Sequence, residues 1–132
     1  MLKEWVQILL KNRDVMQQSI TGFENVNGDF IVHRSTGDEL FLIRPEANDV
    51  NEIVQKTTGK TGLVVLNTRK NLEFVIANWD KLAQLKGLCI YFANPAANEK
   101  WLLYPHTHNL ITEKAALRRG LEAMFVEVAA VG

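Results

Sequence analysis

The sequence lacks most of the residues on which secreted and membrane-spanning proteins depend. Its single cysteine, Cys89, cannot form a disulfide within the chain. No apolar run approaches the roughly 20 residues that a bilayer-spanning helix needs. The N-terminus carries an early acid, Glu4, and lacks a small-residue cleavage site, which argues against a signal peptide. These absences predict a soluble protein of the reducing cytoplasm with no membrane partner.

The chain also has few serines and no net charge. Ser19 and Ser35 have no nucleophile-elbow context, which argues against a serine hydrolase. Fifteen basic and fifteen acidic residues give a net charge of zero, which argues against a dedicated sequence-independent nucleic-acid binder. The charge is unevenly placed, because residues 1–55 have five basic and nine acidic residues, whereas residues 56–132 have ten and six. Either the two halves attract each other, or the second half offers a basic face to an acidic ligand.

The residues that are present describe an ordinary folded domain. Hydrophobic residues make up 47% of the chain and charged residues 23%, a balance that favours a packed core over disorder. A chain of 132 residues has the usual length of one domain. No linker, repeat or low-complexity segment divides it, so we predict a single domain over residues 1–132.

Hydrophobic periodicity and turn residues predict an α/β fold, with α+β as the alternative. An amphipathic helix and a three-stranded antiparallel meander come first, and a helix-strand-helix-strand-strand-helix series around one mixed sheet follows. The predicted helices cover residues 2–19, 49–56, 68–86 and 112–128, and the predicted strands cover 23–26, 30–34, 39–44, 63–66, 88–93 and 100–104. The uninterrupted apolar run of residues 63–66 is typical of a central strand. The tail after residue 128 is predicted to fray.

The element order over residues 2–67 resembles that of the restriction-endonuclease-like fold class. In that class an Asp opens the second strand, and an acid-x-Lys pair ends the third and helps to hold a divalent metal. Asp29 stands at the start of the predicted second strand, but the third ends Ile43-Arg44-Pro45-Glu46. Arg44 and Glu46 thus replace the acid-x-Lys pair, and arginine neither ligates metals nor acts as a base at neutral pH. The resemblance therefore implies a non-catalytic member.

A structural interpretation of the same acids competes with this resemblance. Asp29 directly follows Asn-Gly and is a favoured turn residue. Glu39 follows a second turn and is expected to be solvated. The catalytic alternative is a metal-dependent hydrolase or nuclease that uses Asp29 with Glu39 or Glu46 and a divalent metal to activate water.

A His-x-His pattern gives the second candidate site. On an extended chain, His106 and His108 would project to the same side and could reach one transition-metal ion. A third ligand would come from His33, Cys89 or a nearby acid. The alternatives are an anion-binding role and a polar loop in which both imidazoles satisfy backbone groups. Cys89 itself is predicted to be an inert core residue.

Polar residues after the two apolar strands give the third candidate site. Ligands of open α/β sheets gather outside the carboxyl ends of the strands. If the two strands pair in parallel, their ends meet at one edge of the sheet. We therefore predict a ligand edge there, with helix capping by Thr68 as the alternative; its residues are Asn67, Thr68, Arg69, Lys70 and Asn94.

Two functional hypotheses follow from these sites. The first is a non-catalytic binding or assembly module whose partner is a nucleic acid, another protein or a second copy of the chain. The second is the metal-dependent hydrolase or nuclease, with Asp29 and its acids or His106 and His108 as metal ligands.

Overall fold

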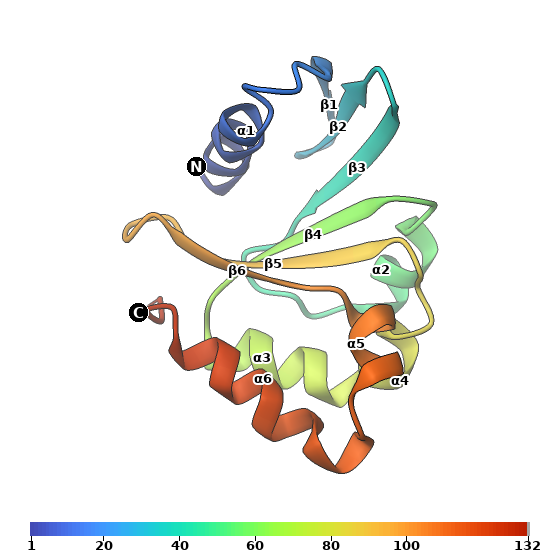
Figure 1. Cartoon of the computed structure of the whole chain (residues 1–132), viewed down its shortest axis with the longest axis vertical. Helices are drawn as coiled ribbons and strands as arrows, with labels where there is room; N and C mark the ends of the chain where they lie inside the picture. The colour runs from blue at the N-terminus through green and yellow to red at the C-terminus, as the bar shows by residue number, and fades with distance from the viewer. Residues whose placement is uncertain (132) are drawn as a thin grey trace.

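The computed structural model describes residues 1–131 and has the predicted α/β fold (Figure 1). Within these residues six strands form one mixed sheet. The elements are α1 (Leu2–Arg13), β1 (Ile20–Val26), β2 (Asp29–Arg34), β3 (Gly37–Ile43), α2 (Val50–Lys56), β4 (Thr61–Leu66), α3 (Arg69–Ala77), α4 (Trp79–Leu82), β5 (Leu88–Asn94), β6 (Glu99–Leu103), α5 (Pro105–Ile111), the 3₁₀ helix η1 (Lys114–Ala116) and α6 (Leu117–Val126). Among these described helices, none is long and apolar enough to cross a membrane.

The strands lie across the sheet in chain order, from β1 to β6. The β1–β2 and β2–β3 pairs are antiparallel, β3–β4 and β4–β5 are parallel, and β6 is antiparallel to β5. Parallel strands need crossover connections, and α2 supplies the first while α3 and α4 supply the second. Every residue of β5 is buried, and so is all of β4 except its last residue. The prediction that residues 63–66 form a central strand covered on both faces is therefore confirmed.

The two faces of the sheet are covered unequally. Helix α1 covers one face alone, and the remaining helices lie on the other (Figure 1). Leu2, Val6 and Leu10 form the buried stripe of α1 and pack with the meander. The larger hydrophobic cluster lies under the other helices and includes Leu72 and Leu121. The α1 face is thus covered by one helix, whereas the helices of the other face cover β3 to β6 and leave β1 and β2 without a helix.

Helix α1 ends at Arg13, well before the predicted end at Ser19. The Asp14 carboxylate accepts hydrogen bonds from the backbone N–H groups of Ser19 (3.0 Å) and Ile20 (2.8 Å), and from the Ser19 hydroxyl. Such side-chain bonds offer the backbone an alternative to the helix. They turn the chain into β1 and leave Met16, which lies inside the predicted helix of residues 2–19, 93% exposed.

The long helix predicted after Thr68 is divided in two at Asn78. The Asn78 side-chain amide donates to the carbonyl oxygen of Phe74 (2.8 Å), and its backbone leaves helical geometry with φ −109° and ψ 19°. Trp79 opens α4 and remains buried, so the predicted core stripe persists across the break. Thr68 caps α3 by accepting the N–H of Asn71 (3.1 Å), as the capping alternative predicted.

Residues 105–111 form α5 where the sequence predicted a loop or an extended segment. Pro105 stands at the first helical position, where its fixed φ suits a helix and its missing N–H costs nothing. Proline also ends strands, so Pro105 indicated where β6 ends but not that a helix begins there. The last helix was predicted from Thr112 but begins at Leu117, after η1.

The segment after α6 is fixed to the sheet, so the prediction of a frayed tail is wrong. The backbone N–H of Val131 donates to the carbonyl oxygen of Asn67 (2.9 Å). The side-chain amide of Asn94 donates to the carbonyl oxygen of Ala129 (2.9 Å). Residues 128–131 therefore cover the carboxyl ends of β4 and β5.

The loops before β4 and β5 pass each other closely at two glycines. A Cβ at Gly87 would overlap the carbonyl oxygen of Gly59, a backbone atom that cannot rotate away. We expect Gly87→Ala to lower the free energy of unfolding by about 1–3 kcal/mol, the usual cost of overpacking. Urea denaturation measures the change. Gly22→Ala is the matched control, because a Cβ there meets nothing within 4 Å; equal stability of the two variants would contradict the close approach.

Candidate functional site

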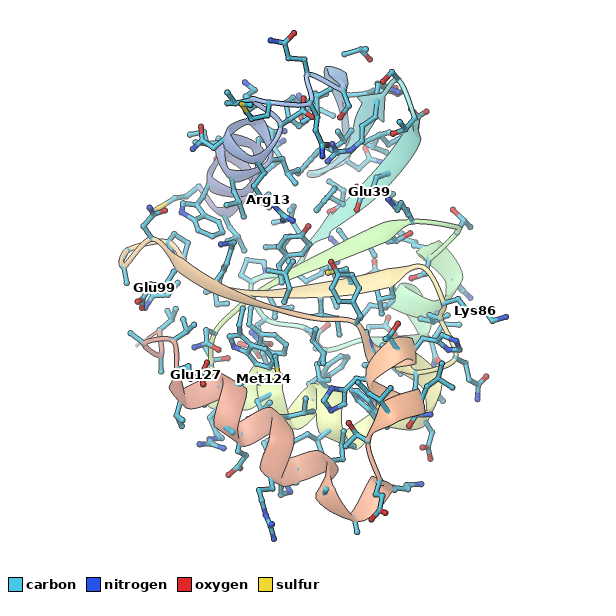
Figure 2. The ribbon with its side chains drawn as sticks, in the orientation of Figure 1. Arg13, Glu39, Lys86, Glu99, Met124 and Glu127 are labelled. Carbon is cyan, nitrogen blue, oxygen red and sulfur yellow. The ribbon has the colours of Figure 1, made fainter. Side chains whose placement is uncertain are left out.

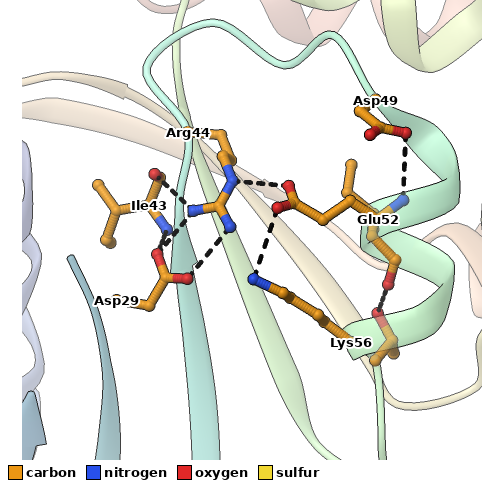
Figure 3. A network of polar contacts seen from close by, with 8 residues as sticks. Asp29, Ile43, Arg44, Asp49, Glu52 and Lys56 are labelled. Atoms are coloured by element: carbon orange, nitrogen blue, oxygen red, sulfur yellow. Dashed lines mark hydrogen bonds and ion pairs between the residues drawn. The ribbon is translucent and has the colours of Figure 1, made fainter. Parts of the chain in front are cut away.

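Asp29 and Arg44 lie side by side because β2 begins where β3 ends. The Arg44 guanidinium donates to both Asp29 carboxylate oxygens, at 2.6 and 3.1 Å, and its Nε donates to Glu52 at 2.9 Å (Figure 3). The N–H of Ile43 donates to the same Asp29 carboxylate at 2.9 Å. Lys56 lies 3.5 Å from the other oxygen of Glu52. Both oxygens of Asp29 are therefore bonded within the chain.

This network is charged at neutral pH. Hydrogen bonds raise the pKa of Arg44 further above its usual value, the bond to Asp29 more than the bond to Glu52. The hydrogen bond from Arg44 lowers the pKa of Glu52. The Asp29 side chain is only 7% exposed. The Asp29 carboxylate thus binds the Arg44 guanidinium. The catalytic hypothesis requires the same carboxylate to bind a metal ion.

Glu39 and Glu46 do not join Asp29. Glu46 lies beyond β3 and forms an exposed ion pair with Lys70 (2.6 Å). Glu39 lies opposite Val32, toward the start of β3. Asp29 lies opposite the third residue after Glu39, and three residues of strand span about 10 Å. Within residues 1–131, no three His, Cys, Asp or Glu side chains are grouped so that they could hold a metal ion.

His106 and His108 lie on α5, so the extended geometry assumed for them is wrong. Helical residues two apart point about 200° away from each other around the axis. His106 Nδ1 lies 2.9 Å from the carbonyl oxygen of Ala83, and the His108 ring packs edge-on against Trp79 with centroids 5.7 Å apart. Burial lowers the pKa of His108. The two imidazoles therefore do not converge on one position that a metal ion could occupy.

The predicted ligand edge forms, but the chain itself occupies it. The β4–β5 pair is parallel, so Asn67 and Asn94 meet as expected. The Asn67 amide nitrogen donates to the carbonyl oxygens of Val128 (3.1 Å) and Ala129 (3.3 Å), and its oxygen accepts from Trp101 (2.8 Å). The two asparagines therefore hold the segment of residues 128–131 and are not open to a ligand.

The basic pair of that edge is also engaged. Arg69 forms an ion pair with Glu122 (2.7 Å), and its guanidinium lies over the ring of Phe125, 4.7 Å from the centroid. Lys70 is paired with Glu46. The Lys70–Glu46 pair joins the two halves of the chain, but most ion pairs join residues of the same half, as Arg118 and Glu73 do. Pairs within a half cannot neutralise its net charge, so the first half keeps an acidic excess and the second half a basic excess.

A polar cavity lies on the open part of the α1 face, at the opposite end of β4 and β5 from the predicted ligand edge. Its volume is about 390 Å³. Arg13 from α1 and Glu39 from β3 mark it in Figure 2, on the α1 side of the sheet. The lining residues are Leu10, Arg13, Asp14, Gln17, Ser19, Arg34, Thr36, Glu39, Lys60, Gly87, Cys89, Tyr91 and Tyr104. We call it the α1–sheet cavity.

The cations of the α1–sheet cavity differ in their partners. Arg34 lies 3.8 Å from Asp14 and 3.7 Å from Glu39, so it is balanced by carboxylates of the cavity wall. Among the ion pairs and side-chain hydrogen bonds of residues 1–131, none involves Arg13 or Lys60. Both side chains line the cavity. They are therefore available to an anion that enters it.

Two groups of β5 form the floor of the cavity. Tyr91 is 5% exposed as a residue and lines the cavity, and no side-chain hydrogen bond of the described residues involves its hydroxyl. Burial raises its pKa, so the phenol stays protonated and can donate. Burial also raises the pKa of Cys89 to about 11, although a hydrogen bond with Tyr104 opposes the shift. The thiol is thus protonated at neutral pH, as expected of an inert core cysteine.

The sequence contained one signal for this cavity. Arg13 stands on the apolar stripe of the first helix, where a charged residue is out of place unless it faces a polar space. Tyr91 gave no such signal, because tyrosine is common in buried strands. Lys60 and Tyr104 gave none, since loop and strand-end positions are commonly polar.

The comparisons with known proteins give no relative. No protein-family model matches the sequence, and neither a curated protein nor a solved structure matches it.

The Asp29–Arg44 pair makes a stability prediction. We expect Asp29→Asn to lower the free energy of unfolding by about 2–3 kcal/mol, because it removes the charge of the carboxylate that binds both terminal nitrogens of a partly buried guanidinium and leaves Glu52 as its charge partner. Chemical denaturation measures the change. Glu46→Gln removes an exposed pair and should change little. A harmless Asp29→Asn substitution would show that the network does not hold the structure.

His33 lies between two carboxylates on the outer strands. Its Nε2 lies 2.9 Å from Glu24 and its Nδ1 3.0 Å from Asp38. Hydrogen bonds raise the pKa of His33 above the ordinary histidine value of 6.5, the bond to Glu24 more than the bond to Asp38.

An NMR titration of the ring protons tests this arrangement. We expect His33 to titrate above pH 6.5 and His108 below it. Because the folded pKa is raised, the stabilisation from His33 is complete below about pH 6.5 and disappears as the pH rises through the folded pKa. Glu24→Gln should bring the His33 titration back toward its ordinary value. An unchanged titration in that variant would exclude the contact.

Proposed function

We propose that this protein is a non-catalytic binding module that receives an anionic partner in the α1–sheet cavity. The observation that carries the proposal is the presence of Arg13 and Lys60 at a polar cavity without a carboxylate partner among residues 1–131. A cation that is already paired gains little from an added anion, whereas an unpaired one gains a charge-assisted hydrogen bond. The unpartnered hydroxyl of Tyr91 adds a neutral donor to the same space.

The catalytic alternative has less support. A hydrolase or nuclease built on Asp29 needs a carboxylate that is open to a metal ion and a second acid beside it. Asp29 is bonded to Arg44 and Ile43, and Glu39 and Glu46 lie elsewhere. These contacts fit a non-catalytic member of the restriction-endonuclease-like class, the class that the element order resembles.

A nucleic-acid strand is the partner class that this cavity favours. Phosphates are the anions that Arg and Lys side chains recognise along a strand, and local cation clusters act even in a protein without net charge. Binding of a protein partner and self-association stay predictions, because no group of residues described above favours either.

Binding of labelled single-stranded DNA and RNA tests this function. Fluorescence anisotropy at about 50 mM salt should show binding that weakens as salt is added. We expect the Arg13→Gln/Lys60→Gln variant to bind more weakly. The slope of log K against log salt should also become shallower, by about 0.7 for each phosphate that no longer meets a cation. The matched control is Lys81→Gln/Arg119→Gln, which removes the same charge from exposed positions outside the cavity.

Two results would contradict the proposal. One is the absence of binding at low salt, or equal weakening in the cavity variant and its control. The other is cleavage of the strands in the presence of Mg²⁺ or Mn²⁺ that Asp29→Asn abolishes, because that would make the protein an enzyme.

A further inference from the structure

We infer that the α1–sheet cavity binds a nucleoside phosphate, either free or at the end of a strand. The phosphate lies at Arg13 and Lys60, and the base lies against the ring of Tyr104. This inference rests on the proposed function, because it names the ligand group of the same cavity.

The size of the cavity suits one nucleotide unit, free or at the end of a strand. About 390 Å³ falls in the range of roughly 300–1,000 Å³ of small-molecule sites. Its lining includes Arg13 at the end of α1, Arg34 and Glu39 of the meander, and Tyr104, which follows β6.

Three donors meet the phosphate. Arg13 offers a planar fork of N–H groups, Lys60 offers a point charge, and Tyr91 offers a protonated hydroxyl from the floor. The Tyr91 hydroxyl is a third donor beside the two cations. It belongs to a residue that is 5% exposed and that lines the cavity, and no side-chain hydrogen bond within residues 1–131 uses it. Among the described residues the fully buried side-chain polar atom without a partner is His108 Nε2, so the Tyr91 hydroxyl faces the open space of the cavity and can donate to a ligand there.

The remaining polar groups favour a nucleoside over inorganic phosphate. Tyr104 is 52% exposed, so its ring offers a free face on which a base of any type can stack. Glu39 is an acceptor in the cavity wall and suits the hydroxyl of a sugar. Its negative charge also disfavours a ligand that carries only phosphate groups. One phosphate, a sugar hydroxyl and a flat base match these three features.

Isothermal titration of the full chain tests the inference with nucleoside 5′-monophosphates. AMP, GMP, CMP and UMP are compared with adenosine, ribose 5-phosphate and inorganic phosphate. We expect the nucleotides to bind at least about tenfold more tightly than any of the three partial ligands, a difference of about 1.4 kcal/mol. Binding of adenosine as tight as that of AMP, or of ribose 5-phosphate as tight as that of the nucleotides, would overturn the inference.

Three single-residue variants assign the parts of the site. Tyr91→Phe keeps the ring and removes only the hydroxyl, so it should weaken all phosphate-bearing ligands and leave adenosine unchanged. Tyr104→Ala should remove the preference for nucleotides over ribose 5-phosphate, and Tyr104→Phe should restore it. Circular dichroism confirms that each variant is folded. If neither tyrosine variant changes these preferences, the nucleotide is not in this cavity.

Oligonucleotides distinguish the two sources of the ligand and separate this inference from the proposed function. Tighter binding of strands with a terminal phosphate than of free nucleotides indicates a strand end, and the reverse indicates a free nucleotide; both support the inference. Strand binding that depends on Arg13 and Lys60, without mononucleotide binding or a preference for terminal phosphates, overturns the inference and leaves the proposed function standing. Absence of binding by every ligand and strand overturns both.

Discussion

The burial of β4 and β5 on both faces is the constraint on which the rest of the structure depends. Parallel strands need crossover helices, and these helices, with α5 and α6, cover one face over β3 to β6. The other face has only α1, whose 12 residues make a cylinder about 18 Å long. Six strands spaced about 4.8 Å apart span about 24 Å, and one helix about 10 Å wide cannot cover them. The α1–sheet cavity is the part of that face which remains open.

The order and type of most elements could be predicted from the sequence, because each depends on local patterns. Alternation, turn residues and the apolar run of β4 are properties of short segments, and the structure confirms them. Helix ends could not be predicted, because single bonds from side chains to the backbone decide them. Asp14 ends α1 through bonds to Ser19 and to Ile20, the first residue of β1. Asn78 divides a predicted helix through one bond to a carbonyl. Neither residue has a pattern that distinguishes it from an ordinary polar surface residue.

The site was predicted less well, because sequence shows which groups exist but not what neutralises them. Asp29 and Arg44 meet as the strand order requires, yet their mutual bonds leave Asp29 no free oxygen. The parallel pairing that places Asn67 beside Asn94 was foreseen, and the segment that covers them was not. The cavity draws its residues from α1, the meander and two later strands, so it exists only in the folded chain. An arginine on an apolar helical stripe was its one local sign.

The bonds of Asn67 have a consequence for how this protein opens. A terminal segment usually detaches from a fold at little cost, independently of the rest. Here detachment of residues 128–131 would leave the fully buried Asn67 amide nitrogen without acceptors, a penalty of roughly 1–3 kcal/mol. The same side chain also holds the indole of Trp101 in β6. Release of residues 128–131 is therefore coupled to loosening of the edge strand β6. The amide protons of this segment and of β6 should exchange with solvent as one cooperative unit.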